Sequence, residues 1–248
     1  MDLGLADRVY VVTGGTKGLG FATSRCLVDD GARVVVSSRS SSSVDAAVAS
    51  LGSSAAVGAA ADNADPGTPD RLVTAALSTW GRLDGALISV GGPPGTDALG
   101  ASDEQWLAAF ESVFLGAVRM ARALVPHLGA GSAIGLVLST SSKSPIDGLA
   151  ISNGLRPGLA MWAKQLADEL GPQGVRVFSL LPGRVLTDRT MSLTPDPADR
   201  ERIAAAIPLR RYGEAAEFAR VAAFLLSPAS SFVTGAMVPV DGGMLRTL

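Results

Sequence analysis

The chain has 248 residues, of which 47% are hydrophobic and 18% charged, and its formal net charge is −2. A chain of this length and composition can bury a large apolar core without disulfides or metals. Its near-neutral charge argues against a general attraction to nucleic acid or to an anionic membrane. Cys26 and His127 are the only residues of their types, which excludes an intrachain disulfide and a cysteine–histidine metal cluster.

The N-terminal residues lack the basic segment and apolar stretch of a signal peptide. No apolar run reaches the about 18 residues of a membrane span. We therefore expect a cytoplasmic protein that binds neither nucleic acid nor a membrane. No repeat, linker or composition shift divides the chain, so we expect a single domain over residues 1–248.

Short β-branched runs alternate with longer helical patterns along the chain. Strands are predicted at 8–13, 32–38, 84–90, 134–140, 175–181 and 236–240. Helices are predicted at 18–30, 68–80, 103–128, 148–170 and 214–226. The serine-rich stretch 38–50 is too short to be a linker. This alternation predicts an α/β fold of the Rossmann type: a doubly wound, mostly parallel sheet with helices on both faces.

The segment TGGTKGLG joins the first predicted strand to the first helix. Glycines there let the backbone approach a pyrophosphate, and the helix N-terminus points free N–H groups at it. A tight turn without a ligand uses the same residues. The prediction of a nucleotide site therefore rests on the position of this segment between a strand and a helix. The predicted dinucleotide contacts are Gly14, Thr16, Lys17, Gly18, Leu19 and Gly20.

The second predicted strand ends in Ser37-Ser38-Arg39. An acidic residue near this position binds the free ribose hydroxyls of NAD, and none is present. The forked, permanently charged guanidinium of Arg39 suits a 2′-phosphate, and Lys17 adds a second positive charge. The pair therefore predicts NADP(H) as cofactor, against the alternative of two solvated surface charges.

The pattern Thr-Gly-x-x-x-Gly-x-Gly resembles the short-chain dehydrogenase/reductase family, and further matches follow along the chain. Residues 207–243 resemble its C-terminal third, above all in the 3-oxoacyl-carrier-protein reductase branch. The resemblance implies an oxidoreductase that binds NADP(H). By the same resemblance, an acidic position faces the adenine, a loop follows the fourth strand, and a Pro-Gly-x-x-x-Thr motif lies beside the nicotinamide. The implied contacts are Asp62, Asn63, Gly91, Pro182, Gly183 and Thr187.

The family's catalytic group is an asparagine, a serine, a tyrosine and a lysine. Alignment with the family helix places Ser152 at the tyrosine and Arg156 at the lysine. Ser139, thirteen residues before Ser152, matches the serine, and Val113 stands at the asparagine. One of the four residues is therefore retained, as in an atypical, reductase-like branch that lacks the full group.

No shifted alignment restores the missing acid. The only tyrosines, Tyr10 and Tyr212, are not followed four residues later by lysine. A phenol has a reference pKa of about 10, and a serine hydroxyl is a far weaker acid, so Ser152 is a poor direct donor. Arg156 stays protonated: it can hold a ribose or stabilise an oxyanion, but it cannot relay a proton. Losing a positioned general acid costs about 10²–10⁴-fold in rate.

The catalytic candidates are therefore Ser139, Ser152 and Arg156, with Arg156 also a candidate cofactor contact. Water held between the two serines, or the nearby Lys143 or Asp147, are the alternative proton donors; solvated loop charges are the plainer interpretation of the last two.

The start of the helix that carries these residues is unusual. Gly154, Pro157 and Gly158 discourage a regular first turn. Pro157 is tolerated if the helix begins near it, with Ser152 or Asn153 as the N-cap. Ser152 as a capping or loop residue is thus the alternative to a catalytic role.

Arg184 and Arg189 follow the Pro-Gly turn, where the family has a flap over its substrate; here the flap is 187–207. Two arginines there suit an anionic substrate such as a carboxylate or a phosphopantetheine arm, although exposed flap charges explain them equally well. With Lys143, they are the candidate substrate contacts.

These observations predict an NADP(H)-dependent oxidoreductase that acts on a carbonyl or alcohol of a small-molecule or 3-oxoacyl-type substrate, without a metal. The alternatives are a non-catalytic NADP(H)-binding sensor or partner subunit, and a non-redox biosynthetic enzyme. As in the family, a homodimer or homotetramer is expected, formed through helices 103–128 and 156–170.

Overall fold

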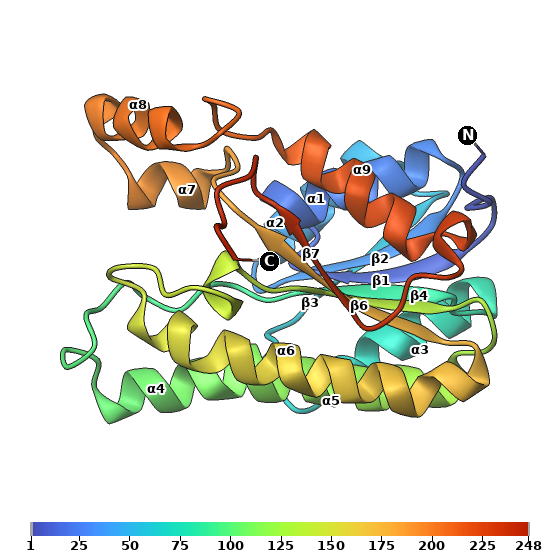
Figure 1. Cartoon of the computed structure of the whole chain (residues 1–248). Helices are drawn as coiled ribbons and strands as arrows, with labels where there is room; N and C mark the ends of the chain where they lie inside the picture. The colour runs from blue at the N-terminus through green and yellow to red at the C-terminus, as the bar shows by residue number, and fades with distance from the viewer. Residues whose placement is uncertain (1, 248) are drawn as a thin grey trace.

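The structure is a computed structural model that describes residues 2–247, and its centre is one seven-stranded sheet (Figure 1). The strand order is β3-β2-β1-β4-β5-β6-β7, and every neighbouring pair is parallel. The predicted doubly wound α/β fold is thereby confirmed. The strands are β1 Val9–Thr13, β2 Arg33–Ser38, β3 Ala56–Ala60, β4 Gly85–Ser89, β5 Ala133–Val137, β6 Arg176–Pro182 and β7 Ala236–Val240.

Helices cover both faces of the sheet, as parallel strands joined by crossovers require (Figure 1). One face carries α1 Gly18–Asp29, α2 Ser41–Leu51 and α9 Ala215–Leu226. The other carries α3 Thr68–Trp80, α4 Asp103–Ala109, α5 Gly116–Leu124 and α6 Ala150–Leu170. Two flap helices, α7 Asp188–Leu193 and α8 Pro197–Ala206, lie beyond the carboxyl ends of the strands. A π-helical segment, Phe110–Leu115, joins α4 to α5, and 3₁₀ turns lie at Val125–His127, Thr140–Ser142, Gly171–Gln173 and Pro228–Ser230.

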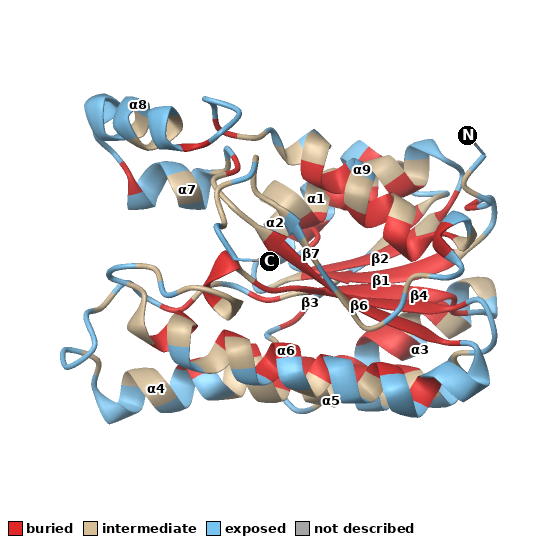
Figure 2. Ribbon diagram, in the orientation of Figure 1, coloured by how far each residue is buried: buried red, intermediate tan, exposed pale blue. Residues whose placement is uncertain are grey.

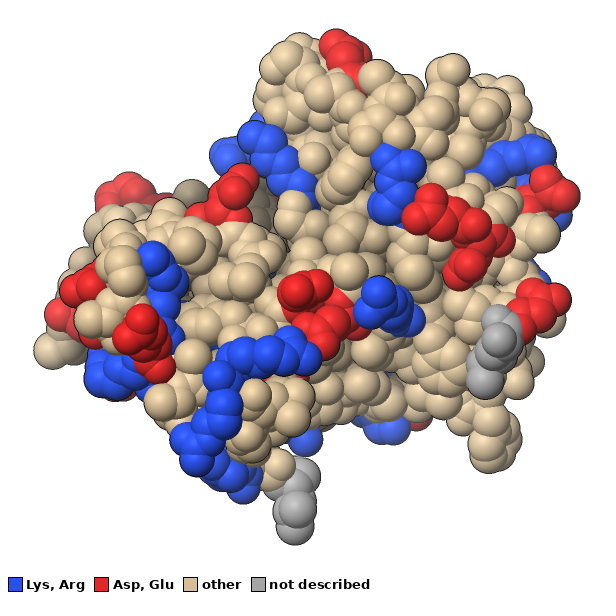
Figure 3. Space-filling model, turned by 90° about the horizontal axis from the view of Figure 1, so that it is seen from above, with Lys and Arg blue, Asp and Glu red and all other residues tan. Residues whose placement is uncertain are grey.

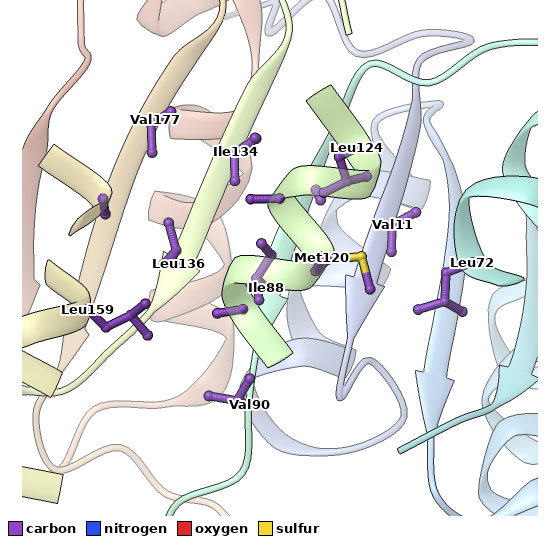
Figure 4. Packing of buried hydrophobic residues seen from close by; sticks show 14 of the residues in the cluster. Val11, Leu72, Ile88, Val90, Met120, Leu124, Ile134, Leu136, Leu159 and Val177 are labelled. Atoms are coloured by element: carbon purple, nitrogen blue, oxygen red, sulfur yellow. The ribbon is translucent and has the colours of Figure 1, made fainter. Parts of the chain in front are cut away.

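The sheet separates two apolar clusters, and its central strands are buried throughout (Figure 2). In Figure 4, Met120 and Leu124 of α5 lie over strand residues that include Val11 and Ile134. Continuous β-branched runs such as β1 form because both of their faces are covered. Each fully buried Val, Leu or Met contributes about 1.5–3 kcal/mol to folding.

The sequence patterns did not predict β3 and α2, nor the two flap helices α7 and α8. The strand β3 has the sequence AVGAA, whose small residues carry little hydrophobic signal. A Cβ at Gly58 of β3 would lie 2.3 Å from the side chain of Val44 in α2, so close packing of the helix requires the small residue. The serine-rich sequence is typical of a loop, but it forms the start of α2. Ser40 is the N-cap and accepts a hydrogen bond from the N–H of Ser43 (3.2 Å).

The N-terminal end of α6 differs from one expectation. The hypothesis that the helix begins near Pro157, with Ser152 or Asn153 as its cap, is wrong, because α6 begins at Ala150 and Pro157 lies inside it. Tertiary contacts hold the early turn: the side chain of Asn153 pairs with both the N–H (3.0 Å) and the carbonyl (2.9 Å) of Ile146. Local propensity is overridden there by these contacts.

The described surface carries mixed charges. Figure 3 shows Lys and Arg interspersed with Asp and Glu on the face seen from above. Within residues 2–247, no helix combines the length and apolarity needed to cross a bilayer.

A buried arginine joins the start of β6 to the C-terminal end of α9. Arg176, 6% exposed, donates hydrogen bonds to the carbonyls of Leu225 (2.7 Å) and Ser227 (2.8 Å) and to the hydroxyl of Ser230 (2.9 Å). The last carbonyls of a helix have no intrahelical partners and carry its negative dipole end. Arg176 therefore acts as the C-terminal cap of α9.

Replacing this cap should destabilise the fold. We expect Arg176→Met to lower the free energy of unfolding by about 2–3 kcal/mol, because buried carbonyls lose charged donors. Arg202→Met removes a largely exposed arginine paired with Asp199 and should cost less than about 0.5 kcal/mol. Urea unfolding at equal protein concentration measures both, and equal losses for the two variants would contradict the capping role.

Candidate active site

The site lies at the junction of β1 and β4, where the order of strands along the sheet reverses direction. The hydroxyl of Thr13 accepts a hydrogen bond from the N–H of Ser89 and donates one to its carbonyl, both at 2.9 Å. Neighbouring strands whose crossovers leave toward opposite faces open a crevice at their carboxyl ends. Gly14 enters this crevice with φ +60°, and a Cβ there would lie 2.9 Å from the Ser89 carbonyl.

The glycine loop forms a tight cradle before α1. A Cβ at Gly20 would lie 2.4 Å from the carbonyl oxygen of Gly14, so the turn closes only without a side chain. The helix begins at Gly18, and its N-cap residue Lys17 makes no side-chain capping bond. The first N–H groups of α1 therefore remain available to an anionic ligand. All six predicted contacts of this loop lie on the cradle: Gly14, Thr16, Lys17, Gly18, Leu19 and Gly20.

A hollow of about 260 Å³ lies beside the cradle. It is lined by Thr16, Lys17, Phe21, Ser42, Ser43, Ala46 and Ala47. Its far wall is the N-terminal part of α2, which adds the positive end of a helix dipole. Arg39 is exposed immediately before the N-cap of that helix. Lys17 thus lines the hollow, and Arg39 precedes the helix N-terminus that forms its wall, an arrangement that suits a phosphate monoester.

The next predicted contacts follow β3 and β4. Asp62 is exposed, and its carboxylate accepts a hydrogen bond from the N–H of Ala64 (3.0 Å). Asn63 packs its backbone against α5, since a Cβ at Gly116 would lie 2.5 Å from the Asn63 carbonyl. Gly91 is exposed in the loop after β4. These residues lie after the carboxyl ends of parallel strands, on the edge of the sheet that carries the cradle.

The Pro-Gly segment returns the chain to the cradle. Pro182 ends β6, and Gly183 packs so closely on Asp241 that a Cβ would lie 2.6 Å from that side chain. Thr187 caps α7 by accepting a hydrogen bond from the N–H of Thr190 (3.2 Å). The methyl group of Thr187 lies 3.4 Å from the position of a Cβ on Gly18. The flap therefore starts directly beside the predicted dinucleotide loop.

Two serine hydroxyls meet above β5. The Ser152 hydroxyl lies 3.0 Å from that of Ser141, and both residues are buried. Ser139 lies two residues before Ser141 and accepts a hydrogen bond from its N–H (3.1 Å), which caps the turn Thr140–Ser142. Ser141 was not among the predicted site residues. In the sequence, Ser141 is only one of several serines that follow this strand. The sequence does not indicate which of their hydroxyls faces α6.

Arg156 is buried one helical turn after Ser152. Residues at i and i+4 share a helix face, so both side chains approach the end of β5. The Arg156 guanidinium, in a side chain that is 4% exposed, donates from Nη1 to the carbonyl of Val137 (2.7 Å). Burial, assisted by the positive charge of Arg189, lowers the pKa of Arg156 to about 10. The group is therefore still a cation at neutral pH.

The other residues of the alignment lie apart from the serine pair. Val113 is buried in the apolar cluster, within the π-helical segment. Tyr10 is buried beneath α9 with its hydroxyl donating to the Leu226 carbonyl (3.3 Å), and burial raises its pKa to about 12. Tyr212 lines a hollow between α8 and α9. Neither tyrosine replaces the missing acid.

The candidate substrate residues are separated by the fold. Lys143 follows the turn after β5 and is partly buried. Arg184 lines a hollow with Leu209 and Asp241 at the base of the flap. Arg189 instead reaches the loop after β4, where its Nη2 donates to the carbonyl of Pro93 (2.9 Å). Within residues 2–247, no three His, Cys, Asp or Glu side chains form a group that could hold a metal ion.

Comparisons with known proteins agree with this geometry. The sequence profile of the family described as enoyl-(acyl carrier protein) reductase matches residues 14–245. Dehydrogenase/reductase SDR family member 4 from Oryctolagus cuniculus is 35% identical over 96% of this chain and 94% of its own. L-rhamnose 1-dehydrogenase (NAD(P)(+)) from Azotobacter vinelandii is 32% identical over 98% of this chain and 99% of its own.

Among solved structures, L-sorbose reductase from Gluconobacter frateurii, in complex with NADPH and L-sorbose, aligns with a TM-score of 0.94. The two chains are 30% identical, and the alignment covers 100% of each. The strand order, the glycine cradle and these similarities lead to one conclusion. The chain belongs to the short-chain dehydrogenase/reductase family.

Proposed function

We propose that this protein is an NADP(H)-dependent oxidoreductase that interconverts a carbonyl and an alcohol on a small or acyl-type substrate. The observation that carries the proposal is the cradle at the β1–β4 junction, with Lys17 and Arg39 beside its hollow. The similar L-sorbose reductase is complexed with NADPH, and the similar L-rhamnose 1-dehydrogenase uses NAD(P)(+). A 3-oxoacyl compound is one candidate for the substrate.

The residues of the crevice fit a phosphorylated dinucleotide. The cradle has space only for backbone at Gly14 and Gly20, which lets a pyrophosphate approach the N–H groups of α1. Lys17 and Arg39 would hold a 2′-phosphate, and Asp62 and Asn63 would lie at the adenine. Gly91 and the segment Pro182, Gly183 and Thr187 would border the nicotinamide half. Bound NADPH supplies the hydride for carbonyl reduction.

The proton side of the reaction departs from the family's usual residues. Arg156 keeps a positive charge near the Ser152 hydroxyl and would stabilise the oxygen that becomes negative as hydride arrives. The Ser152 and Ser141 hydroxyls, 3.0 Å apart, would hold that oxygen or a water that gives up the proton. Ser139 orders the turn that carries Ser141. Arg156 would thus stabilise the negative charge on the substrate oxygen, and solvent would supply the proton.

The degenerate catalytic group also favours a second candidate, a non-catalytic NADP(H)-binding sensor or partner subunit. This second candidate rests on the alignment, which puts Ser152, Arg156 and Val113 at the positions of the tyrosine, lysine and asparagine. A non-redox reaction on the same scaffold is a third candidate. Binding of NADPH without turnover would support the second candidate.

A homodimer or homotetramer is part of the proposal. Leu107 on α4 is 65% exposed and Met161 on α6 is 73% exposed, and Phe110 stacks on Phe114 beside them (ring centroids 5.3 Å apart). Exposed apolar side chains gathered on helices are typical of protein–protein contacts. Their burial against a second copy of the chain would remove them from water.

The proposal predicts both binding and turnover. We expect NADPH fluorescence to change on titration with the protein, and NADPH to be oxidised in the presence of ketones, 3-oxoacyl thioesters or ketoses. The rate should be low, since the positioned general acid is lost. Binding without oxidation across the panel would move the conclusion to the sensor, and absence of binding would contradict the cofactor assignment.

The preference for the 2′-phosphate should depend on two side chains. We expect Lys17→Ala and Arg39→Ala each to weaken NADPH binding about tenfold and to leave NADH binding within about twofold, because each removes a charge-assisted contact. Arg33→Ala is the matched control, since Arg33 lies at the opposite end of β2 in an ion pair with Asp7. Equal weakening of NADPH and NADH would argue against the 2′-phosphate contact.

Restoring the family residues tests the alignment of α6. We expect Ser152→Tyr combined with Arg156→Lys to raise carbonyl reduction by about 10²-fold, because a phenol beside a cation is a competent acid. The control is Ser152→Phe with Arg156→Lys, which supplies the same ring without the hydroxyl. A gain that is equal in both variants, or absent from the tyrosine variant while both bind NADPH, would refute the assignment of Ser152 to the tyrosine position.

A further inference from the structure

Two arginines lie at the carboxyl ends of the neighbouring strands β4 and β5 without a carboxylate partner among the described residues. Among residues 2–247, neither Arg156 nor Arg189 takes part in an ion pair with a carboxylate. Arg156 bonds the carbonyl of Val137 at the end of β5, Arg189 bonds the loop after β4, and these two strands are neighbours in which Val137 pairs with Ser89. Arg156 is buried, whereas Arg189 is exposed. An uncompensated buried charge is costly, so Arg156 is typical of a place where a ligand brings the negative charge, and Arg189 is the accessible cation beside the same strand ends.

Arg156 uses only part of its capacity to donate hydrogen bonds. A guanidinium carries five N–H groups in a planar fork. Within the described chain, the hydrogen bond of this group goes from Nη1 to Val137, and the buried Nε has no partner. Most of the fork therefore has no hydrogen-bond partner within the described residues.

Arg189 is held across the crevice by the shape of the loop after β4. Its Nη2 donates to the carbonyl of Pro93 (2.9 Å), and its guanidinium lies directly on Gly92. A Cβ at Gly92 would lie 2.2 Å from Nη2, 2.5 Å from Cζ and 2.8 Å from Nε, so only glycine leaves room for the group. The flap and the loop thus place a cation after the carboxyl end of β4, the neighbour of the strand whose last carbonyl binds Arg156.

We propose that Arg156 and Arg189 together bind the carboxylate of the substrate, which makes the substrate a 2-oxo or 3-oxo acid or the corresponding hydroxy acid. Arginine forks match carboxylate geometry, and two of them can share one carboxylate. The inference rests on the proposed function, because the reducible carbonyl is taken to lie at Ser152.

The spacing on α6 sets the distance between the two substrate groups. Cβ atoms at i and i+4 of a helix lie about 5–6 Å apart, so Ser152 and Arg156 contact groups that are near neighbours in a ligand. A carboxylate one or two bonds from the carbonyl meets this requirement, and a carboxylate at the far end of a long chain does not. Arg184 lines a different hollow, with Asp241, and is not part of the proposed carboxylate site.

Matched pairs of acids and esters test the proposal by turnover. The probes are phenylglyoxylate and acetoacetate, each against its methyl ester, with NADPH. We expect the wild type to prefer the acid of at least one pair through a lower KM. Arg189→Gln should reduce kcat/KM for that acid by about ten- to a hundredfold and leave the ester within about twofold. Arg184→Gln, which removes the same charge from the same segment, should change neither.

Binding without chemistry separates this proposal from the proposed function. Mandelate and 3-hydroxybutyrate cannot be reduced by NADPH, so their effect on the melting temperature reports binding alone. We expect one of these acids, but not its methyl ester, to raise the Tm of the wild type with or without NADPH, and to lose the effect in Arg189→Gln. This result would support the anion site even if no compound were turned over.

Two results would overturn the inference. One is a loss of discrimination in binding: the wild type binds acids and esters equally well, or an acid binds equally well to the wild type and to Arg189→Gln. The other is weaker NADPH binding in Arg189→Gln with the acid preference unchanged, which would assign Arg189 to the dinucleotide phosphates. Normal NADPH turnover of uncharged ketones in either case would leave the proposed function standing.

Discussion

The contact between the carboxyl ends of β1 and β4 is the constraint on which the site depends. One hydroxyl, that of Thr13, satisfies both peptide groups of Ser89 and keeps the two strands in register where the chain leaves them for opposite faces. The crevice opens at this point, and Gly14 and Gly20 can close the turn above it only because they lack side chains. The N-terminus of α1 then points into the crevice with its dipole and free N–H groups.

In the function we propose, electrostatic stabilisation around this crevice would replace a positioned general acid. Arg156 cannot give up its proton at neutral pH, yet its buried cation has a larger electrostatic effect than the same charge in water. Its position depends on the early turn of α6, which Asn153 ties to Ile146, and on the Val137 carbonyl at the end of β5. Arg189 adds a second cation from the flap. In our proposals, the two arginines would bind the substrate carboxylate and stabilise the oxyanion within one small region.

The success of prediction from the sequence varied with the strength of the local signal. The strand β1 was predicted closely because a run of buried β-branched residues has few other interpretations. The strand β3 was missed because AVGAA owes its conformation to pairing with β2 and packing beneath Val44. The hypothesis that α6 begins near Pro157 was wrong for a related reason. Pro157 disfavours the early turn, but tertiary hydrogen bonds maintain it.

By itself, the sequence determined the order of elements, the glycine loop and the positions of the basic residues beside it, because these follow from periodicity and from residue types at short spacing. Alignment with the family helix also predicts Ser152 and Arg156 at the positions of the tyrosine and the lysine. The tertiary structure alone decided that Ser141 is the hydroxyl that meets Ser152, and that Arg189 rather than Arg184 reaches Pro93, a residue 96 positions away. Such contacts depend on how distant segments pack, which no local pattern encodes.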